Sequence, residues 1–458
     1  MTAEATAERR RGGASERGKQ FWTVENLTSA PFLLVVATVL LCVFGLVMVF
    51  SASSIESVEA GGKAWDEFAH QAVFMALSAG ACLIVRGVGG RFWVERAFYV
   101  LWGITVLMLI AVQLLGDESH GATRWLYIGP ISLQPSEFAK ITLIMAAARL
   151  LAGWERGEFT LLRLAIRFAL FIAIPMGLIL IQKDLGTLLI LAAAMFLMLI
   201  LAGVSTTVLV GIVVVGVVLV ILLILSSGYR LARFTIYLDP YSDYYGDGWQ
   251  LIHGLYAFAS GGFFGVGLGN SRQKYSYLPE AENDFIFAII GEELGFLGGL
   301  FVVALFVLFG VSGMRIAYQA RDRDRVSSLM ASGLTVLVLV QALLNMGGVL
   351  QLLPLSGRPL PFISSGGSSI MANLIIVGLL LGVARDNECE ALTQRGNARR
   401  ASARQLTVVE GGPARRESTR RTTERAASST RRVRPSAEER PQSQGFLDPD
   451  HSREKGRR

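Results

Sequence analysis

Charged residues that could do chemistry gather in front of one strongly apolar segment. Within twenty positions the chain places Lys274, Glu280, Glu282, Asp284, Glu292 and Glu293. Apolar residues then run from Phe285 to about Gly310, which at ~1.5 Å per residue is enough to cross the ~30 Å core of a bilayer. Asp284 therefore stands at the mouth of a predicted span, where a carboxylate loses water and marks a functional position. The alternative is that Asn283 or Asp284 only caps the helix that follows.

The composition indicates a protein that crosses a membrane several times. The 458 residues are 52% hydrophobic and 17% charged, with a mean hydropathy of +0.48, too apolar for a soluble protein of this length. Its three cysteines show no CxxC spacing, so neither a disulfide framework nor a structural zinc site is supported. Its four histidines are isolated, which argues against a histidine-rich metal site.

Apolar runs predict an all-α polytopic membrane protein with about ten transmembrane helices. The predicted spans are Phe32–Phe50, Phe68–Val85, Ala97–Leu115, Phe138–Ala152, Phe168–Ile181, Leu185–Ala202, Val208–Leu225, Phe285–Gly310, Leu329–Leu350 and Ser369–Val383. Every second loop is rich in arginine, which places those loops and both termini in the cytoplasm. The loops around Trp125, before Asp284 and over 351–368 then share the outer face. The largest outer loop, 226–284, precedes the eighth span.

The ends of the chain differ from the middle. Residues 1–30 are polar and are predicted to be a cytoplasmic arm, and 31–385 form the ten-helix membrane domain. Residues 386–458 are rich in Arg, Ser, Thr and Pro, a composition that predicts a disordered basic cytoplasmic tail close to anionic lipid. Because no aromatic residues alternate with the basic ones, nucleic-acid binding is not supported.

Further candidate residues lie at other outer corners of the predicted bundle. Glu137 and Lys140 are three positions apart and share a helix face, either as a structural ion pair or, with Asp184, as the lining of a polar cavity. Trp125, beside Arg124, either faces that cavity or anchors the interface. The remaining candidates are Lys274, for an anionic headgroup, and the hydroxyls of Ser364 and Ser368. The GxGxG run at 265–269 is interpreted as a set of sharp turns rather than as an anion nest.

Most of these candidate residues lie in or next to five short sequence motifs. In chain order they are GATRW…QPSEFAK, DLGT, GLGNS, YLPEAENDFIFAIIGEELG and PLPFISSGGSS. Together they resemble the FtsW and RodA family of shape, elongation, division and sporulation proteins over roughly Pro31 to Arg385. YLPEA and GLGNS favour the FtsW branch, and the basic tail resembles that of actinobacterial division members.

The resemblance implies ten transmembrane helices and polymerisation of lipid II, the lipid-linked disaccharide-pentapeptide precursor of peptidoglycan. It implies an essential aspartate at Asp284, with Trp125 and the QPSE segment lining the same outer cavity. It also implies a plasma-membrane location at the division septum, and as partners a class B penicillin-binding protein (a transpeptidase) and other division proteins. Three positions depart from the family pattern: Glu282-Asn283 replaces His-Thr, Lys183 replaces Pro, and Ser365 replaces Tyr.

The implied reaction needs one base rather than an acid and a base. A sugar hydroxyl attacks the anomeric carbon of a second sugar, and a lipid pyrophosphate leaves as an already stable anion, unlike the leaving group of a glycosidase. Asp284 is the expected general base, a role typically worth 10²–10⁴-fold. Lys274, Lys140 or a divalent cation, Mg²⁺ or Mn²⁺, would hold the pyrophosphate. The expected substrate-binding residues are Arg124, Trp125, Glu137, Lys140, Asp184, Lys274, Ser364 and Ser368.

Two functions of other classes remain open. A lipid II flippase would need polar residues through the full depth of the membrane, and a division scaffold would need only loops and a tail that recruit partners. The predicted spans are almost wholly apolar at mid-membrane, which favours polymerisation over transport.

Overall fold

The computed structural model describes residues 28–410, apart from positions 60, 120–121, 129–130, 226–227, 247 and 276. By its internal contacts the chain divides into two units, Met1–Thr393 and Gln394–Arg458. Almost all of the predicted arm 1–30, and the tail beyond Glu410, lie outside the described residues.

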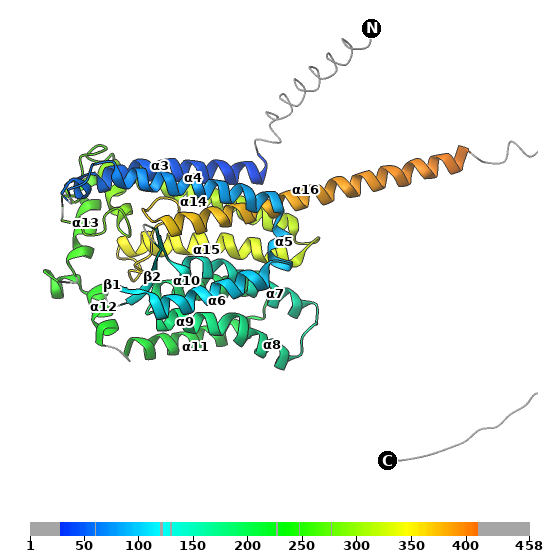
Figure 1. Ribbon diagram of the computed structural model, residues 1–458, viewed down its shortest axis with the longest axis horizontal. Helices are drawn as coiled ribbons and strands as arrows, with labels where there is room; N and C mark the ends of the chain where they lie inside the picture. The colour runs from blue at the N-terminus through cyan, green and yellow to red at the C-terminus, as the bar shows by residue number, and fades with distance from the viewer. Residues whose placement is uncertain are drawn as a thin grey trace, which may run out of the picture. The chain divides into compact units, whose positions relative to one another are not determined.

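Helices make up most of the described chain (Figure 1). They are α3 (Ala30–Glu59), α4 (Asp66–Val88), α5 (Gly90–Glu95), α6 (Phe98–Leu115), α7 (Pro135–Glu155), α8 (Leu161–Phe168), α9 (Ile174–Ile181), α10 (Leu185–Leu201), α11 (Thr206–Leu225), α12 (Gly228–Leu238), α13 (Trp249–Gly261), α14 (Ile286–Ala320), α15 (Arg325–Val349) and α16 (Gly367–Glu410). A π-helical turn, Ala169–Ala173, joins α8 to α9, and a 3-10 turn, Pro240–Asp243, follows α12.

Each predicted span coincides with a helix or a joined pair of helices, which confirms the polytopic helical class. Seven helices among the described residues are long and apolar enough to cross a membrane, and α10 and α11 are shorter apolar helices. The span predicted at Phe138–Ala152 lies in α7, which carries Glu137, Lys140 and Arg149. The number ten therefore remains a prediction. Apolar side chains on α4, α6 and α11 are exposed, as they would be toward lipid, whereas 89% of the apolar window of α15 is buried.

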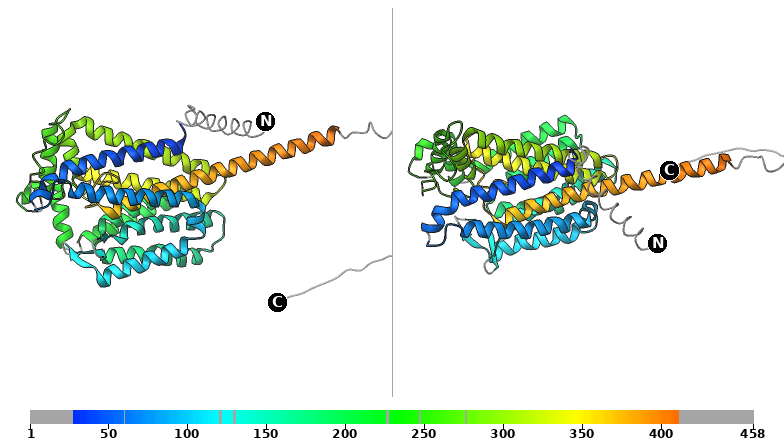
Figure 2. Two further views of the ribbon diagram at one scale, coloured as in Figure 1. Left: turned by 45° about the horizontal axis from the view of Figure 1, so that its top comes forward. Right: turned by 90° about the horizontal axis from the view of Figure 1, so that it is seen from above.

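The long helices run side by side (Figures 1 and 2). The small sheet, α12 and α13 lie at one end of this bundle, and α5 and α8 lie at the other. Helix α15 packs against α7, α10 and α14, so it forms the centre around which the others are placed.

Helix α14 is not one continuous rod, although its residues were predicted as a single span. Gly295 has φ 67°, ψ −163° inside it, a conformation that glycine adopts without steric penalty. The preceding glycine-rich loop packs against the break: the backbone N–H groups of Val266 and Gly267 donate to the carbonyls of Glu292 and Glu293. A Cβ added to Gly265 would lie 2.2 Å from the Glu293 carbonyl oxygen, so this glycine is required by close packing.

A small antiparallel sheet is absent from the sequence-based prediction. Its strands are β1 (Asp117–Ser119), β2 (Ala122–Ile128) and β3 (Ile131–Leu133), in the order β1-β2-β3. The central strand, ATRWLYI, contains the β-branched and aromatic residues that favour extended structure. The all-α description therefore holds for the bundle but not for the loop that contains Trp125.

The C-terminal helix is longer than expected. Residues 386–410 were predicted to be disordered, yet α16 continues through them to Glu410. The segment contains many good helix formers, Ala, Arg, Glu, Leu and Gln, and its first proline after Arg385 is Pro413. The basic composition of this segment therefore does not prevent helix formation.

Candidate functional site

Three loops far apart in sequence meet at one end of the bundle. The Ser364 hydroxyl donates to the Asn283 carbonyl at 2.6 Å, and the Ser365 N–H donates to the Glu282 carbonyl at 2.9 Å. The Gln134 N–H donates to the Ser368 hydroxyl at 3.0 Å. These contacts confirm that the Trp125 loop, the Asp284 loop and the 351–368 loop share a face.

Asp284 lies half-buried at the start of α14, beside the 351–368 loop. Its carbonyl accepts a hydrogen bond from the Asn345 amide at 2.9 Å, which fixes the backbone there. A Cβ added to Gly357 would lie 3.6 Å from the Asp284 Oδ2, an ordinary contact distance, so the loop passes directly beside the carboxylate. Phe285, not Asn283 or Asp284, occupies the N-cap position of α14.

Arg358 is the centre of the charges beside Asp284. Its guanidinium is 3% exposed and lies 2.6 Å from Glu137 Oε1 and 3.5 Å from Asp184 Oδ2. Burial alone would lower the pKa of Arg358, but the carboxylates of Asp184, Glu137 and Asp284 raise it above its ordinary value. Arg358 therefore remains charged, and its charge is shared by three carboxylates.

Glu137 and Lys140 form the predicted ion pair one turn inside α7. The Lys140 Nζ lies 2.8 Å from Glu137 Oε2 and donates to the Gln341 Oε1 of α15 at 2.6 Å. The Gln341 amide donates in turn to the Pro359 carbonyl at 2.9 Å. The pair is therefore also a structural link between α7, α15 and the loop that carries Arg358.

Asp184 explains the DLGT motif. Its carboxylate caps α10 by accepting from the Thr187 N–H at 3.2 Å and from the Thr187 hydroxyl at 2.8 Å. A Cβ on Gly186 would meet the Ser356 carbonyl at 2.2 Å, so only glycine lets the Arg358 loop approach this helix end. Burial raises the pKa of Asp184, but the guanidiniums of Arg358 and Arg124 more than offset it and hold the pKa below its ordinary value.

The strand residue Arg124 reaches the same corner. The Arg124 Nη2 donates to the Lys183 carbonyl at 2.7 Å, next to Asp184. Trp125 is partly buried in β2 and pairs with Asp117 of β1. The sheet therefore fixes the backbone of Trp125 next to Arg124, and the contact of Trp125 with substrate remains a prediction.

Ser364 and Ser368 use their hydroxyls to hold backbone. Ser364 Oγ accepts from the Leu360 N–H at 2.8 Å, besides its bond to Asn283. Ser368 Oγ donates to the Ser132 carbonyl at 3.0 Å, besides accepting from Gln134. Both side chains thus keep the three loops in register, and a direct substrate contact for either is still only a prediction.

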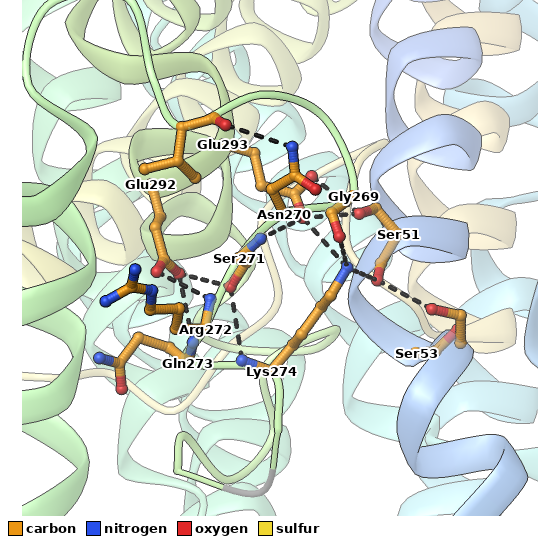
Figure 3. A network of polar contacts seen from close by, with 12 residues as sticks. Ser51, Ser53, Gly269, Asn270, Ser271, Arg272, Gln273, Lys274, Glu292 and Glu293 are labelled. Carbon is orange, nitrogen blue, oxygen red and sulfur yellow. Dashed lines mark hydrogen bonds and ion pairs between the residues drawn. The ribbon is translucent and has the colours of Figure 1, made fainter.

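Lys274 belongs to a second buried cluster, shown in Figure 3. Its ammonium donates to the Gly269 carbonyl at 2.7 Å and lies 3.4 Å from Glu293 Oε1. The Ser51 hydroxyl of α3 donates to the Glu293 carboxylate at 2.7 Å. The neighbouring Glu292 accepts from the Arg272 N–H at 2.9 Å and from the Ser271 hydroxyl. None of these partners belongs to the cluster around Arg358, so the structure does not bring Lys274 together with the other predicted site residues.

Comparison with known proteins identifies the architecture. A family model described as cell cycle protein, for FtsW, RodA and SpoVE, matches residues 32–389. The chain belongs to the FtsW, RodA and SpoVE family. It is 36% identical to a probable peptidoglycan glycosyltransferase FtsW of Trichlorobacter lovleyi, over 80% of this chain and 96% of that protein. It is 37% identical to stage V sporulation protein E of Bacillus subtilis, over 78% of this chain and 98% of that protein.

Solved structures of the FtsW, RodA and SpoVE family share the fold. One, described as showing structural coordination of polymerization and crosslinking by a peptidoglycan synthase complex, is 28% identical and has a TM-score of 0.62. It covers 77% of this chain and 97% of that chain. The RodA of Thermus thermophilus is 27% identical with a TM-score of 0.53, over 77% of this chain and 96% of that chain.

Arg358, Gln341 and Asn345 were not predicted from the sequence to belong to the site. Arg358 had a visible signal, because it is an arginine in GRPLPF on a predicted outer loop, where arginine is uncommon. Gln341 and Asn345 gave a weaker signal in the sequence: they are two amides four positions apart in an otherwise apolar span. Their partners lie on other elements, which spacing along one helix cannot reveal.

Proposed function

We propose that this chain is a peptidoglycan glycosyltransferase that polymerises lipid II into glycan strands, with Asp284 as the general base. The observation that carries the proposal is the placement of Asp284: a half-buried carboxylate next to Gly357 and within the field of buried Arg358. The names of the family relatives, probable peptidoglycan glycosyltransferases FtsW, support the same reaction.

The step at Asp284 is a proton transfer. Its carboxylate would take the proton of the attacking sugar hydroxyl while the new glycosidic bond forms and the bond to the lipid pyrophosphate breaks. Asn345 and Ser364 hold the backbone on either side of this carboxylate, so its position is fixed before substrate arrives. Pre-positioning of this kind lowers the barrier because less reorganisation is needed in the transition state.

The pyrophosphate needs cationic or N–H donors near Asp284. The Nη atoms of Arg358 contact Glu137 and Asp184, but its buried Nε has no hydrogen-bond partner among the described residues, which leaves one N–H for an anionic oxygen. Lys140, which the sequence suggested for this role, is already held by Glu137 and Gln341. We therefore assign the pyrophosphate to Arg358 first, with Arg124 at the rim of the same corner.

A divalent cation remains a proposal. The described residues hold no group of three or more His, Cys, Asp or Glu side chains placed to bind a metal. Mg²⁺ is commonly held by one or two carboxylates together with substrate phosphates, and Asp284 beside a pyrophosphate fits that pattern. Such an ion would supply charge neutralisation on the leaving group.

The cellular setting is proposed from the family. A class B penicillin-binding protein is the expected partner, consistent with the similar peptidoglycan synthase complex. Placement at the septum of the plasma membrane, with both termini cytoplasmic, follows from the arginine-rich loops and from the FtsW relatives.

The test is polymerisation of labelled lipid II by the purified protein with its transpeptidase partner, comparing wild type with Asp284→Ala and Asp284→Asn. We expect both variants to insert and bind the partner normally and to lose at least about 10²-fold in rate, because neither can accept the proton. Asp239→Asn, a substitution of an exposed aspartate in the same large loop, is the matched control and should retain activity.

Two outcomes would contradict the assignment. An Asp284→Asn variant that extends glycan strands near the wild-type rate would end the general-base role. Transport of intact lipid II across a vesicle by the wild type, without strand formation, would favour the flippase instead.

A further inference from the structure

A cavity lined by arginine and aromatic side chains lies at the other end of α7. The residues that line it come from α5, α6, α7, α8, the α7–α8 connection and the start of α15, and its volume is about 300 Å³. Glu137 and Arg149 are twelve positions apart on α7, or ~18 Å along the helix, which separates this cavity from the site at Asp284. In the proposed topology this end of the bundle faces the cytoplasm.

Arg149 forms one wall of the cavity and is held rigidly. Its guanidinium lies over the rings of Phe98 and Tyr99, at 5.0 and 5.1 Å from their centroids. It donates to the Val94 carbonyl at 2.7 Å and to the Glu95 carbonyl at 3.2 Å. The rings and carbonyls orient the cation, but carbonyl oxygens carry only partial charge and do not neutralise it.

Arg167 of α8 also lines the cavity. Its guanidinium stacks over the Phe159 ring at 4.2 Å. Phe159 can approach so closely because α7 has Gly153 there, where a Cβ would lie 2.3 Å from the ring. The stack therefore depends on the packing of the α7–α8 turn.

The carboxylates of the cavity are committed to other cations. Glu95 pairs with Arg91 at 3.2 Å, and Glu158 pairs with Arg156 at 2.6 Å. Among the residues that the structure describes, neither Arg149 nor Arg167 has a carboxylate within 4.0 Å. Two guanidiniums thus share one cavity without an anionic partner, and guanidinium is the side chain best matched to the oxygens of a phosphate.

Helix α8 indicates which kind of phosphate would reach this cavity. Its sequence, LLRLAIRF, is strongly amphipathic, and Leu161, Leu162, Ile166 and Phe168 are exposed. Helix α8 is the first part of the segment Leu161–Ile181, which is long and apolar enough to cross a membrane, so its arginines lie at the end of a span, at the headgroup level. Trp154, at the end of α7, is also exposed, as interfacial tryptophans are.

We propose that Arg149 and Arg167 bind the phosphate of an anionic phospholipid headgroup at this end of the bundle. A volume of about 300 Å³ suits a headgroup rather than a whole lipid, whose acyl chains would lie against the exposed apolar residues of α8. Basic pockets between helices at a cytoplasmic surface are suited to such lipids. The site would fix the amphipathic helix and the end of α7 to the membrane surface.

Native mass spectrometry of the purified full-length chain tests this proposal, with phosphatidylglycerol, phosphatidylcholine and glycerol 3-phosphate as probes. Phosphatidylglycerol should bind more tightly than phosphatidylcholine, and Arg167→Gln should weaken it about tenfold. Arg163→Gln is the matched control, since Arg163 lies on the same helix but does not line the cavity. Arg163→Gln should change the affinity no more than about twofold.

A thermal unfolding series in the same lipids keeps the test informative if a variant is less stable. A bound lipid raises the unfolding temperature by mass action, so the wild type and Arg163→Gln should gain more from phosphatidylglycerol than Arg167→Gln does. If Arg163→Gln and Arg167→Gln lose the same part of the lipid-dependent rise in unfolding temperature, the lipid is bound by general surface charge and the proposed site is wrong. If glycerol 3-phosphate displaces phosphatidylglycerol and binds as tightly as the lipid does, the site recognises a free phosphate and the proposal of a lipid ligand is wrong.

Discussion

The two buried polar clusters near the start of α14 differ in how completely their members satisfy one another. Around Lys274, the ammonium, the Glu293 carboxylate and the Ser51 hydroxyl all contact one another or nearby backbone. Around Arg358, the buried polar atoms without a hydrogen-bond partner among the described residues include Arg358 Nε, Ser356 Oγ and Asn345 Oδ1. A buried polar group left unpaired is costly, so it usually points to a ligand or to water.

The two clusters also differ in role: one is structural and the other is placed to contact a substrate. The Lys274 cluster joins α3, the glycine-rich loop and the part of α14 that precedes the break at Gly295, and Figure 3 shows these contacts. The Arg358 cluster instead surrounds a carboxylate that remains half-exposed, Asp284. The first cluster therefore holds the broken helix in place, and the second presents charge to a substrate.

Replacement of Arg358 should give the larger effect on activity. Arg358→Lys keeps the charge but loses the fork that reaches both Glu137 and Asp184, so we expect a folded protein that polymerises lipid II roughly 10²-fold more slowly. Arg358→Ala should also destabilise the protein by about 3–5 kcal/mol, because it leaves buried carboxylates uncompensated. Rates and unfolding temperatures of both variants check this, and an Arg358→Lys variant with wild-type turnover would remove Arg358 from the site.

Trp125 comes next, because it is partly buried in β2 next to Arg124, which contacts the Lys183 carbonyl. Trp125→Ala should lower turnover about tenfold while expression and membrane insertion stay normal. Trp65, an exposed tryptophan just before α4, is the matched control, and Trp65→Ala should leave turnover unchanged. If Trp125→Ala turns over normally but accumulates poorly, the residue is an interfacial anchor.

The Lys274 cluster should respond in stability rather than in chemistry. Lys274→Met leaves the buried Glu293 carboxylate without its cation and should cost about 3–5 kcal/mol. Combining it with Glu293→Gln removes both charges and should recover most of that loss. We expect each folded variant to keep its rate per active molecule; a rate loss that persists in the stable double variant would make Lys274 a substrate ligand after all.

The sequence predicted the helices well because a bilayer allows few alternatives. Runs of apolar residues locate the spans, and arginine-rich loops orient them. The sheet around Trp125 and the break at Gly295 were missed because short strands and single glycines carry little signal against long apolar runs. The helical segment up to Glu410 was missed because a basic composition was interpreted as disorder.

The sequence suggested candidate site residues and the Glu137–Lys140 pair, but not the contacts that link different elements. Asp284, Glu137 and Asp184 were each identified from charge at a helix end, and the structure links all three through Arg358. That link spans more than two hundred positions from Glu137, so no periodicity along the chain could reveal it. Lys274 was assigned to substrate because its partners, Ser51 and Glu293, could not be recognised from spacing alone.

Glu282, two positions before Asp284, provides the smallest expected effect, a dependence of stability on pH. Burial, with the nearby carboxylates of Glu56 and Glu280, raises the pKa of Glu282 to about 7. The folded state therefore favours the protonated form: this stabilisation is complete below a pH of about 4.5, the ordinary pKa, and is lost as the pH rises through 7.

Glu282→Gln has nearly the shape of protonated Glu282 but stays neutral at every pH, so its comparison with the wild type isolates the contribution of Glu282 to the pH dependence of stability. Wild type and variant should have similar unfolding temperatures near pH 5, and the wild type should fall below the variant by pH 8. Glu56→Gln, which removes a neighbouring negative charge, should weaken the trend without abolishing it, because burial remains the larger cause. A constant difference between wild type and Glu282→Gln from pH 5 to pH 8 would show that Glu282 does not titrate in this range.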